Sequence, residues 1–256
     1  MMPPAMRPFP ALLLLSCCLT LSAAPLSAQP PPAAATASET SARPLQAFQA
    51  SYDAHYRGKP AGSARLQLTG ATTRWQVDLD IAARAGIAGI LGLDLRQTTE
   101  FETLADGGYR PLSQRTVRKG LLLGRESNGR YDWARGQAQW TGDLKKRHRA
   151  PVALQPGDMS GLLINLAIVR DARPGAVLRY RFVEGGRVRE HVYAVADAPE
   201  QVEIGGLRYT VLRVARSNGG NDDTVVWVAE GVPTPVRILQ RENGEDAVDL
   251  RLIEYR

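Results

Sequence analysis

Hydrophobic and polar residues alternate along much of the chain from about residue 45 onward. In the segment 48–56 every second residue is apolar, and mostly polar residues stand between them. The same period of two recurs over 64–69 and 75–81. Successive side chains of a strand point to opposite faces of a sheet, so this pattern predicts strands with one buried and one wetter face.

Further short strands follow, separated by turn sequences rich in glycine, asparagine and aspartate. They are expected near 96–104, 112–119, 125–134, 137–141, 177–184, 187–196, 201–204, 207–216, 224–229, 235–242 and 247–255. Gly185-Gly186 and Asn243-Gly244 are examples of the turns, and such dipeptides are typical of tight hairpins. Many short strands joined by tight turns predict a mainly β fold, a curled antiparallel sheet that forms a barrel or half-barrel.

One segment, 159–170, departs from this alternation. It is apolar on nearly every side, which predicts a buried helix. Asp158 and Ser160 stand where a helix N-cap is needed, and Arg170 suits the C-terminal end of the helix dipole. We therefore expect one buried helix packed on the concave face of the sheet.

The first 28 residues have the pattern of a cleaved secretory signal. Arg7 is their only charged residue, an apolar run follows over 11–23, and small residues at Ser27 and Ala28 predict cleavage near Ala28. The apolar run is shorter than the ~18–20 residues that span a membrane, so no stable transmembrane segment is expected after signal removal. The predicted location of the exported chain is the periplasm.

Both cysteines, Cys17 and Cys18, lie within this signal. The exported chain would therefore have no thiol for a disulfide, a nucleophile or a metal. One alternative stays open, because residues 14–17 loosely resemble a lipobox, in which Cys17 would be lipidated. Residues 29–44 are rich in proline, alanine and serine and predict a flexible linker. The range 45–256 is then a single β-rich domain.

The composition is that of a globular protein, with 44% hydrophobic and 23% charged residues. The formal charge is +6 for the whole chain, and without residues 1–28 it would be +5. This modest excess favours contact with anionic surfaces without requiring it. Nucleic acid is not expected as a partner of an exported protein, and the oligomeric state stays open.

Three stretches carry a resemblance to a known family. They are 52–62 with Tyr52, Tyr56-Arg57-Gly58 and Gly62; 157–160 with Gly157-Asp158-Met159-Ser160; and 227–255 with Trp227-Val228, Val232-Pro233-Thr234-Pro235-Val236-Arg237-Ile238, Asp249-Leu250, Leu252 and Tyr255. Together they resemble the exported bacterial family catalogued as domain of unknown function 3108, over about 45–256. The resemblance implies a periplasmic, largely β protein without an assigned activity, so it carries over no functional residues. The last stretch is also similar in outline to Lol-type lipoprotein carriers, curled sheets that shelter acyl chains.

No motif predicts catalysis or metal binding. Ser160 lies between glycines but lacks the G-x-S-x-G spacing, and the chain lacks the α/β pattern that a nucleophile elbow needs. The histidines are isolated and show no metal-ligand spacing: His55, His148 and His191. We therefore predict a protein that is not an enzyme, with no catalytic residue, no cofactor and no metal site.

Two other features point to a ligand. The stretches 85–93 and 120–124 are apolar and glycine-rich, which is typical of a flap over a hydrophobic cavity, of a membrane-touching tip or of a buried connection. Residues 145–149 form the densest basic run, which could contact anionic lipid head groups or be a solvated loop before Pro151.

These features predict a periplasmic protein that binds or shields a hydrophobic envelope component, a lipid or an acyl chain, in its curled sheet. The candidate ligand-binding residues are Trp75, Ile87, Ile90, Leu91, Leu93, Leu121, Leu122 and Leu123. The candidate head-group contacts are Lys145, Lys146, Arg147 and Arg149. The alternative is a structural or assembly factor that contacts other envelope proteins through its sheet edges or the flap. An enzyme, the third interpretation, would need a polar cleft with converging Asp, His or Ser groups.

Overall fold

The computed structural model describes residues 45–83, 94–119 and 124–256, which all belong to the compact unit Ala42–Arg256. The strands in these ranges are β1 (Phe48–Tyr56), β2 (Lys59–Ala71), β3 (Arg74–Ala83), β4 (Asp94–Thr103), β5 (Tyr109–Lys119), β6 (Arg125–Asp132), β7 (Gln137–Gly142), β8 (Val152–Ala153), β9 (Asp158–Met159), β10 (Val177–Glu184), β11 (Arg187–Val195), β12 (Glu200–Ile204), β13 (Leu207–Arg216), β14 (Thr224–Ala229), β15 (Arg237–Glu242) and β16 (Glu245–Tyr255). The helices are the 3-10 turn η1 (Lys146–His148) and the α-helix α2 (Gly161–Asp171).

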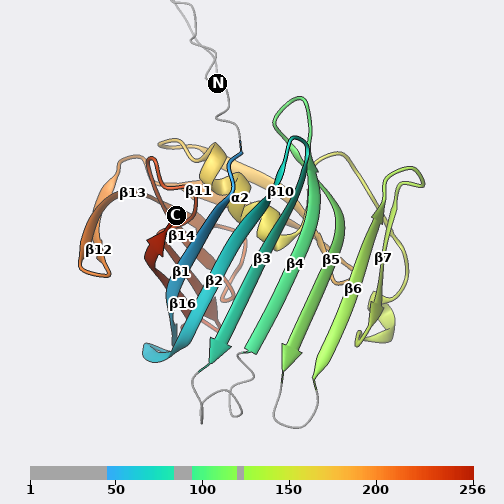
Figure 1. Ribbon diagram of the computed structural model, residues 1–256, viewed down its shortest axis with the longest axis horizontal. Helices are drawn as coiled ribbons and strands as arrows, with labels where there is room; N and C mark the ends of the chain where they lie inside the picture. Colours follow the sequence, from blue (N-terminus) through green and yellow to red (C-terminus); the bar gives the residue numbers. More distant parts are fainter. Residues whose placement is uncertain (1–44, 84–93, 120–123) are drawn as a thin grey trace, which may run out of the picture. The chain divides into compact units, whose positions relative to one another are not determined.

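These strands form one continuous sheet (Figure 1), in the order β8-β7-β6-β5-β4-β3-β2-β1-β16-β15-β14-β13-β11-β10-β9, with β12 paired to β13 beside this path. Its two ends, β8 and β9, are not neighbours in the sheet, so the curled sheet stays open. The predicted mainly β, barrel-like fold is confirmed. One strand pair departs from the antiparallel expectation, because β9 runs parallel to β10.

The helix α2 packs on the inner face of this sheet. It contacts β3, β5 and β10, and Figure 1 shows it behind β1–β5. Its buried side chains are Leu162, Leu163, Ile164, Leu166, Ala167 and Ile168. On the strands the inner face is marked by side chains such as Tyr52, Leu68, Val77 and Phe101, each at most 1% exposed. The buried helix predicted near 159–170 is therefore confirmed, and it supplies the apolar area that one sheet face alone could not bury.

The start of α2 corrects one detail of the prediction. Ser160 is the N-cap, and its hydroxyl accepts a hydrogen bond from the backbone N–H of Leu163 at 3.5 Å. Asp158, which was expected to share this role, lies instead in β9 and is fully buried. Its carboxylate forms a salt bridge with Arg181 of β10 and accepts the backbone N–H of Gln155 at 2.8 Å. The parallel pairing of β9 with β10 places Asp158 opposite Arg181 and takes it away from the helix.

A second, smaller apolar cluster joins β6 and β7 to β10. Its buried members are Tyr131, Ala138, Trp140 and Val183. The Tyr131 hydroxyl donates a hydrogen bond of 2.6 Å to the backbone carbonyl of Val183. The indole of Trp140 crosses β6 at Gly129, where an added Cβ would come within 2.2 Å of the ring. This cluster fixes the C-terminal end of β10 beside the loop that carries η1.

Candidate functional site

The basic run that the sequence singled out forms a helical turn on the surface. Lys145 precedes η1, Lys146 and Arg147 belong to it, and Arg149 follows it. All four side chains are exposed. This exposure is expected both for a solvated loop and for residues that contact a ligand. The intervening His148 is only half exposed because it faces another part of the chain.

His148 fixes η1 on the turn between β10 and β11. Its Nδ1 lies 3.3 Å from the carbonyl oxygen of Gly186, and its Nε2 accepts a hydrogen bond of 3.1 Å from Arg147 Nε. The tautomer with its proton on Nδ1 satisfies both contacts. Gly186 has a φ of +68°, and an added Cβ would stand 1.9 Å from the backbone oxygen of His148. A glycine is therefore needed where the two backbones meet.

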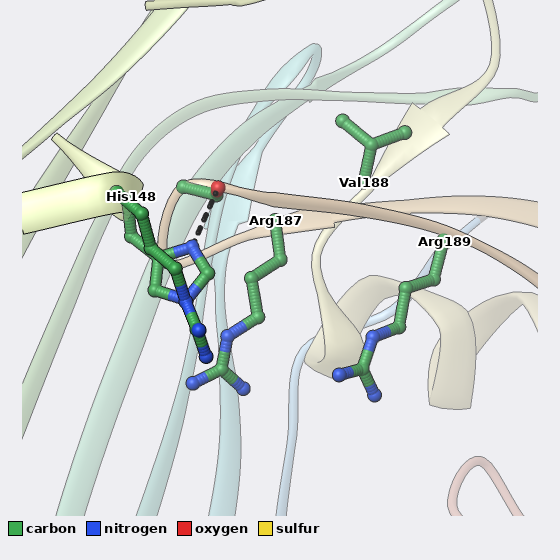
Figure 2. A pocket seen from close by; sticks show the side chains of 6 residues that line it. His148, Arg187, Val188 and Arg189 are labelled. Carbon is green, nitrogen blue, oxygen red and sulfur yellow. Dashed lines mark hydrogen bonds between the residues drawn. The ribbon is translucent and has the colours of Figure 1, made fainter. Parts of the chain in front are cut away.

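This contact borders a hollow of about 440 Å³, shown in Figure 2. Its lining residues are Arg147, His148, Gly186, Arg187, Val188 and Arg189. In Figure 2 the side chains of Arg187 and Arg189 extend in the same direction and that of Val188 in the other, as alternation along a strand requires. We call this feature the basic hollow.

The cations of the basic hollow have no carboxylate partner. Within the described part of the chain, no Asp or Glu oxygen lies within 4.0 Å of the charged groups of Arg147, Arg187 or Arg189. Neighbouring arginines of β10 differ in this respect, since Arg179 pairs with Glu190 at 3.2 Å and Arg181 pairs with Asp158. The positive charge of the hollow is thus uncompensated, although paired charges lie nearby.

The carboxylate of Glu184 is the nearest one to Arg187 in the strand register, but it is bound by other groups. Glu184 stands opposite Arg187 in the β10–β11 pair. Its two oxygens accept hydrogen bonds from Gln97 Nε2 at 2.7 Å and from the backbone N–H of Gly161 at 2.9 Å. Burial raises the pKa of Glu184 despite these hydrogen bonds. Glu184 therefore serves the start of α2 and leaves Arg187 free.

The positive region continues along the same face of β10 and β11. Phe182 stands opposite Arg189, and its ring stacks on His191 with centroids 4.6 Å apart. Burial, together with the positive charges of Arg216 and Arg189, lowers the pKa of His191 to about 4. Burial also lowers the pKa of Arg216, with Arg189 acting in the same direction. Burial is the largest cause of both shifts, and the positive charge of Arg189 adds to each.

The apolar candidates fall into two groups. Trp75 belongs to the main core, is 8% exposed, and its indole N–H lies 3.4 Å from the carbonyl of Thr72. The others, Ile87, Ile90, Leu91, Leu93 and Leu121–Leu123, lie outside the described residues, as do the signal, the linker and Cys17. Their roles stay predictions.

The hollow can bind an anion, and its residues do not form a metal site. In the ranges that the structure covers, no three His, Cys, Asp or Glu side chains come together to hold a metal ion. In the same ranges no helix is long and apolar enough to cross a membrane. The hydroxyl of Ser160 serves the cap of α2 and lies 3.1 Å from that of Thr99.

The sequence analysis missed Arg187, Arg189 and Gly186. These residues lie about forty positions after the basic run, and only the contact between Gly186 and His148 brings the two segments together. A signal was present, since the alternation over 187–189 places both arginines on one strand face. Nothing in that pattern shows which face it is, or that η1 lies beside it.

Comparison with one solved structure supports the fold. A β-barrel-like protein of domain of unknown function DUF1849 from Brucella abortus aligns with a TM-score of 0.52 and 12% identity, over 83% of this chain and 98% of its own. A DUF1089 family protein from Pseudomonas aeruginosa aligns with a TM-score of 0.36 and 11% identity, over 70% of this chain and 89% of its own. No curated protein matches the chain in sequence. The family described as "Protein of unknown function (DUF3108)" matches residues 51–251, so the chain belongs to this family, as the resemblance predicted.

Proposed function

We propose that the protein is a non-enzymatic binding protein of the bacterial periplasm that holds the anionic head group of an envelope lipid in its basic hollow. The observation that carries this proposal is the set of Arg147, Arg187 and Arg189 around one hollow without a carboxylate partner within the described residues. Guanidinium groups bind phosphate and carboxylate well, and an unpaired set of them favours an anionic ligand.

The apolar part of such a ligand would lie along the inner face of the sheet. Leu79, Ile81 and Phe182 pack against the main core but are only partly buried. Phe182 shares its strand face with Arg189, so apolar and cationic groups lie side by side. This arrangement suits an amphiphile, whose head and tail need different surroundings.

The experiment measures binding of the purified exported domain to vesicles. Phosphatidylcholine vesicles with and without an anionic phospholipid are floated on a density gradient with the protein. We expect binding to the anionic vesicles, and we expect the double variant Arg187→Gln/Arg189→Gln to lose about 2 kcal/mol, or roughly thirtyfold in affinity, because each arginine near a charged surface contributes about 1 kcal/mol.

A matched variant separates the hollow from overall charge. Arg130 of β6 and Arg208 of β13 are also exposed strand arginines, and neither has a carboxylate within 4.0 Å in the described part of the chain. Arg130→Gln/Arg208→Gln therefore removes the same charge elsewhere. An equal loss in both double variants would show general electrostatic attraction and overturn the proposal. Cross-linking that recovers one envelope protein, together with no vesicle binding, would favour an assembly factor instead.

A further inference from the structure

We propose that the basic hollow selects a phosphate monoester over a phosphodiester. This inference rests on the proposed function, because it names the chemical class of head group that the same site prefers. Two observations support it. Three unpaired guanidinium groups line the hollow, and a hydrogen bond to His148 holds one of them, that of Arg147.

Charge complementarity is the first argument. Arg147, Arg187 and Arg189 bring three positive charges to one hollow, and no carboxylate in the described ranges lies within 4.0 Å of them. A phosphodiester brings one negative charge, whereas a monoester brings about −1.5 to −2 near neutral pH. The monoester therefore matches the hollow more closely, and its attraction grows with the added charge.

Hydrogen-bond geometry is the second argument. Arg187 and Arg189 stand two positions apart on one strand face, which places their backbones about 7 Å from each other. Two guanidinium groups on stems of that spacing can converge on different oxygens of one phosphate. Arg147 approaches from η1, where its Nε–H is held by His148 at 3.1 Å and its terminal amino groups stay available. Three donors suit the three terminal oxygens of a monoester better than the two of a diester.

Among the residues that the structure describes, the surroundings do not supply a competing anion. Glu184 is engaged by Gln97 and the start of α2. Glu190 faces the other side of β11 and pairs with Arg179. Both carboxylates of the β10–β11 hairpin therefore have partners of their own, and an incoming phosphate has no carboxylate of this hairpin to displace.

The test compares two kinds of phosphatidylcholine vesicle at matched surface charge. One kind contains phosphatidic acid, a monoester, and the other contains phosphatidylglycerol, a diester. We expect about tenfold tighter binding to phosphatidic acid, since one further hydrogen bond between charged groups contributes about that factor. Equal binding to both overturns the selectivity and leaves the proposed function standing, whereas binding to neither overturns the proposed function as well.

A charge-preserving variant tests the part played by the guanidinium forks. Arg187→Lys/Arg189→Lys keeps both positive charges on exposed positions and removes the planar donor pairs. We expect this variant, checked for an unchanged circular dichroism spectrum, to bind both vesicles equally. A preference for phosphatidic acid that survives the lysine substitutions overturns the geometric argument.

A soluble probe distinguishes a lipid from a free metabolite. Glycerol 3-phosphate carries the same monoester without acyl chains. Its displacement of the protein from phosphatidic acid vesicles supports monoester recognition at a lipid head group. Calorimetric binding of glycerol 3-phosphate by a protein that ignores both vesicles supports the same recognition of a soluble ligand and overturns the lipid function. Failure to bind glycerol 3-phosphate at all overturns the inference.

Discussion

Replacing Gly186 with alanine tests whether the contact between η1 and the β10–β11 turn builds the basic hollow. Gly185 and Gly186 are neighbours in that turn, with φ values of +59° and +68°. An added Cβ at Gly185 meets nothing within 4 Å, whereas at Gly186 it would lie 1.9 Å from the backbone oxygen of His148. The two substitutions share the backbone effect and differ only in the contact with η1.

The expected magnitudes follow from this difference. A residue with a Cβ in the left-handed region costs about 1 kcal/mol, so Gly185→Ala should lower the free energy of unfolding by that amount. In Gly186→Ala the obstacle is a backbone atom, so η1 must move and the hydrogen bond between His148 Nδ1 and the backbone carbonyl of Gly186 is lost. That loss adds about 1 kcal/mol, which gives about 2 kcal/mol in total. Arg147 would move with η1, so vesicle affinity should fall about fivefold.

Two measurements check these values. Urea unfolding, followed by tryptophan fluorescence, gives the free energy of unfolding of each variant, and flotation with anionic vesicles gives the affinity. Gly185→Ala is the control and should bind like the wild type. If the two variants unfold at the same urea concentration, the close approach of the backbones is refuted. If Gly186→Ala is the less stable variant yet binds like the wild type, then the position of η1 does not determine the hollow.

Three further predictions concern buried groups and pH. Tyr131→Phe removes a 2.6 Å hydrogen bond to a buried carbonyl of β10 and should cost about 1 kcal/mol in urea unfolding. Burial acts to raise the pKa of Asp249, but the hydrogen bonds from two arginines outweigh it and hold the pKa below its usual value. Asp249→Asn should therefore destabilise the protein near neutral pH, by about 2 kcal/mol, and the difference from wild type should shrink as the pH falls below about 4. His191, with a pKa lowered from 6.5 to about 4, contributes stability above pH 6.5 that is lost as the pH falls toward 4. His191→Phe should flatten this part of the stability profile, and a bound phosphate near Arg189 should raise the imidazole pKa in an NMR titration.

The fold could be predicted from the sequence because one of its two layers is a sheet whose period of two is visible in most strands. The failures lie where backbone geometry overrides that pattern. Gly58-Lys59-Pro60 has the composition of a turn, but the first turn consists of Arg57 and Gly58, with φ values of +47° and +75°. A two-residue hairpin turn of this kind needs positive φ at both of its residues. Because the first of them is Arg57 and not a glycine, the sequence did not indicate a turn at this position. Lys59 and Pro60 consequently begin β2.

Only one of the two segments that form the candidate site could be predicted from the sequence, and the reason differs from that for the turn. Charge density along the chain identified Lys145–Arg149, because that property is local. Arg187 and Arg189 belong to a strand with ordinary alternation, and their importance comes from which neighbour lies beside them. That neighbour is set by long-range pairing, which places β10 and β11 at one end of the sheet order, and by the docking of His148 on Gly186. Neither feature has a local sequence signal.

The unpaired charges of the hollow do not help the fold, which is why they bear on function. The backbones of Arg187 and Arg189 are about 7 Å apart, and two unit charges at a separation of that order in water repel each other by about 0.6 kcal/mol, which salt reduces further. The hairpin carries two carboxylates, but Glu184 is used at the start of α2, and Glu190 faces the other side of β11 and pairs with Arg179. A bound anion would remove the repulsion that these carboxylates leave in place. The free energy of unfolding and the pKa of His191 should then rise together when phosphate binds, and a ligand that changes one without the other is not bound at the hollow.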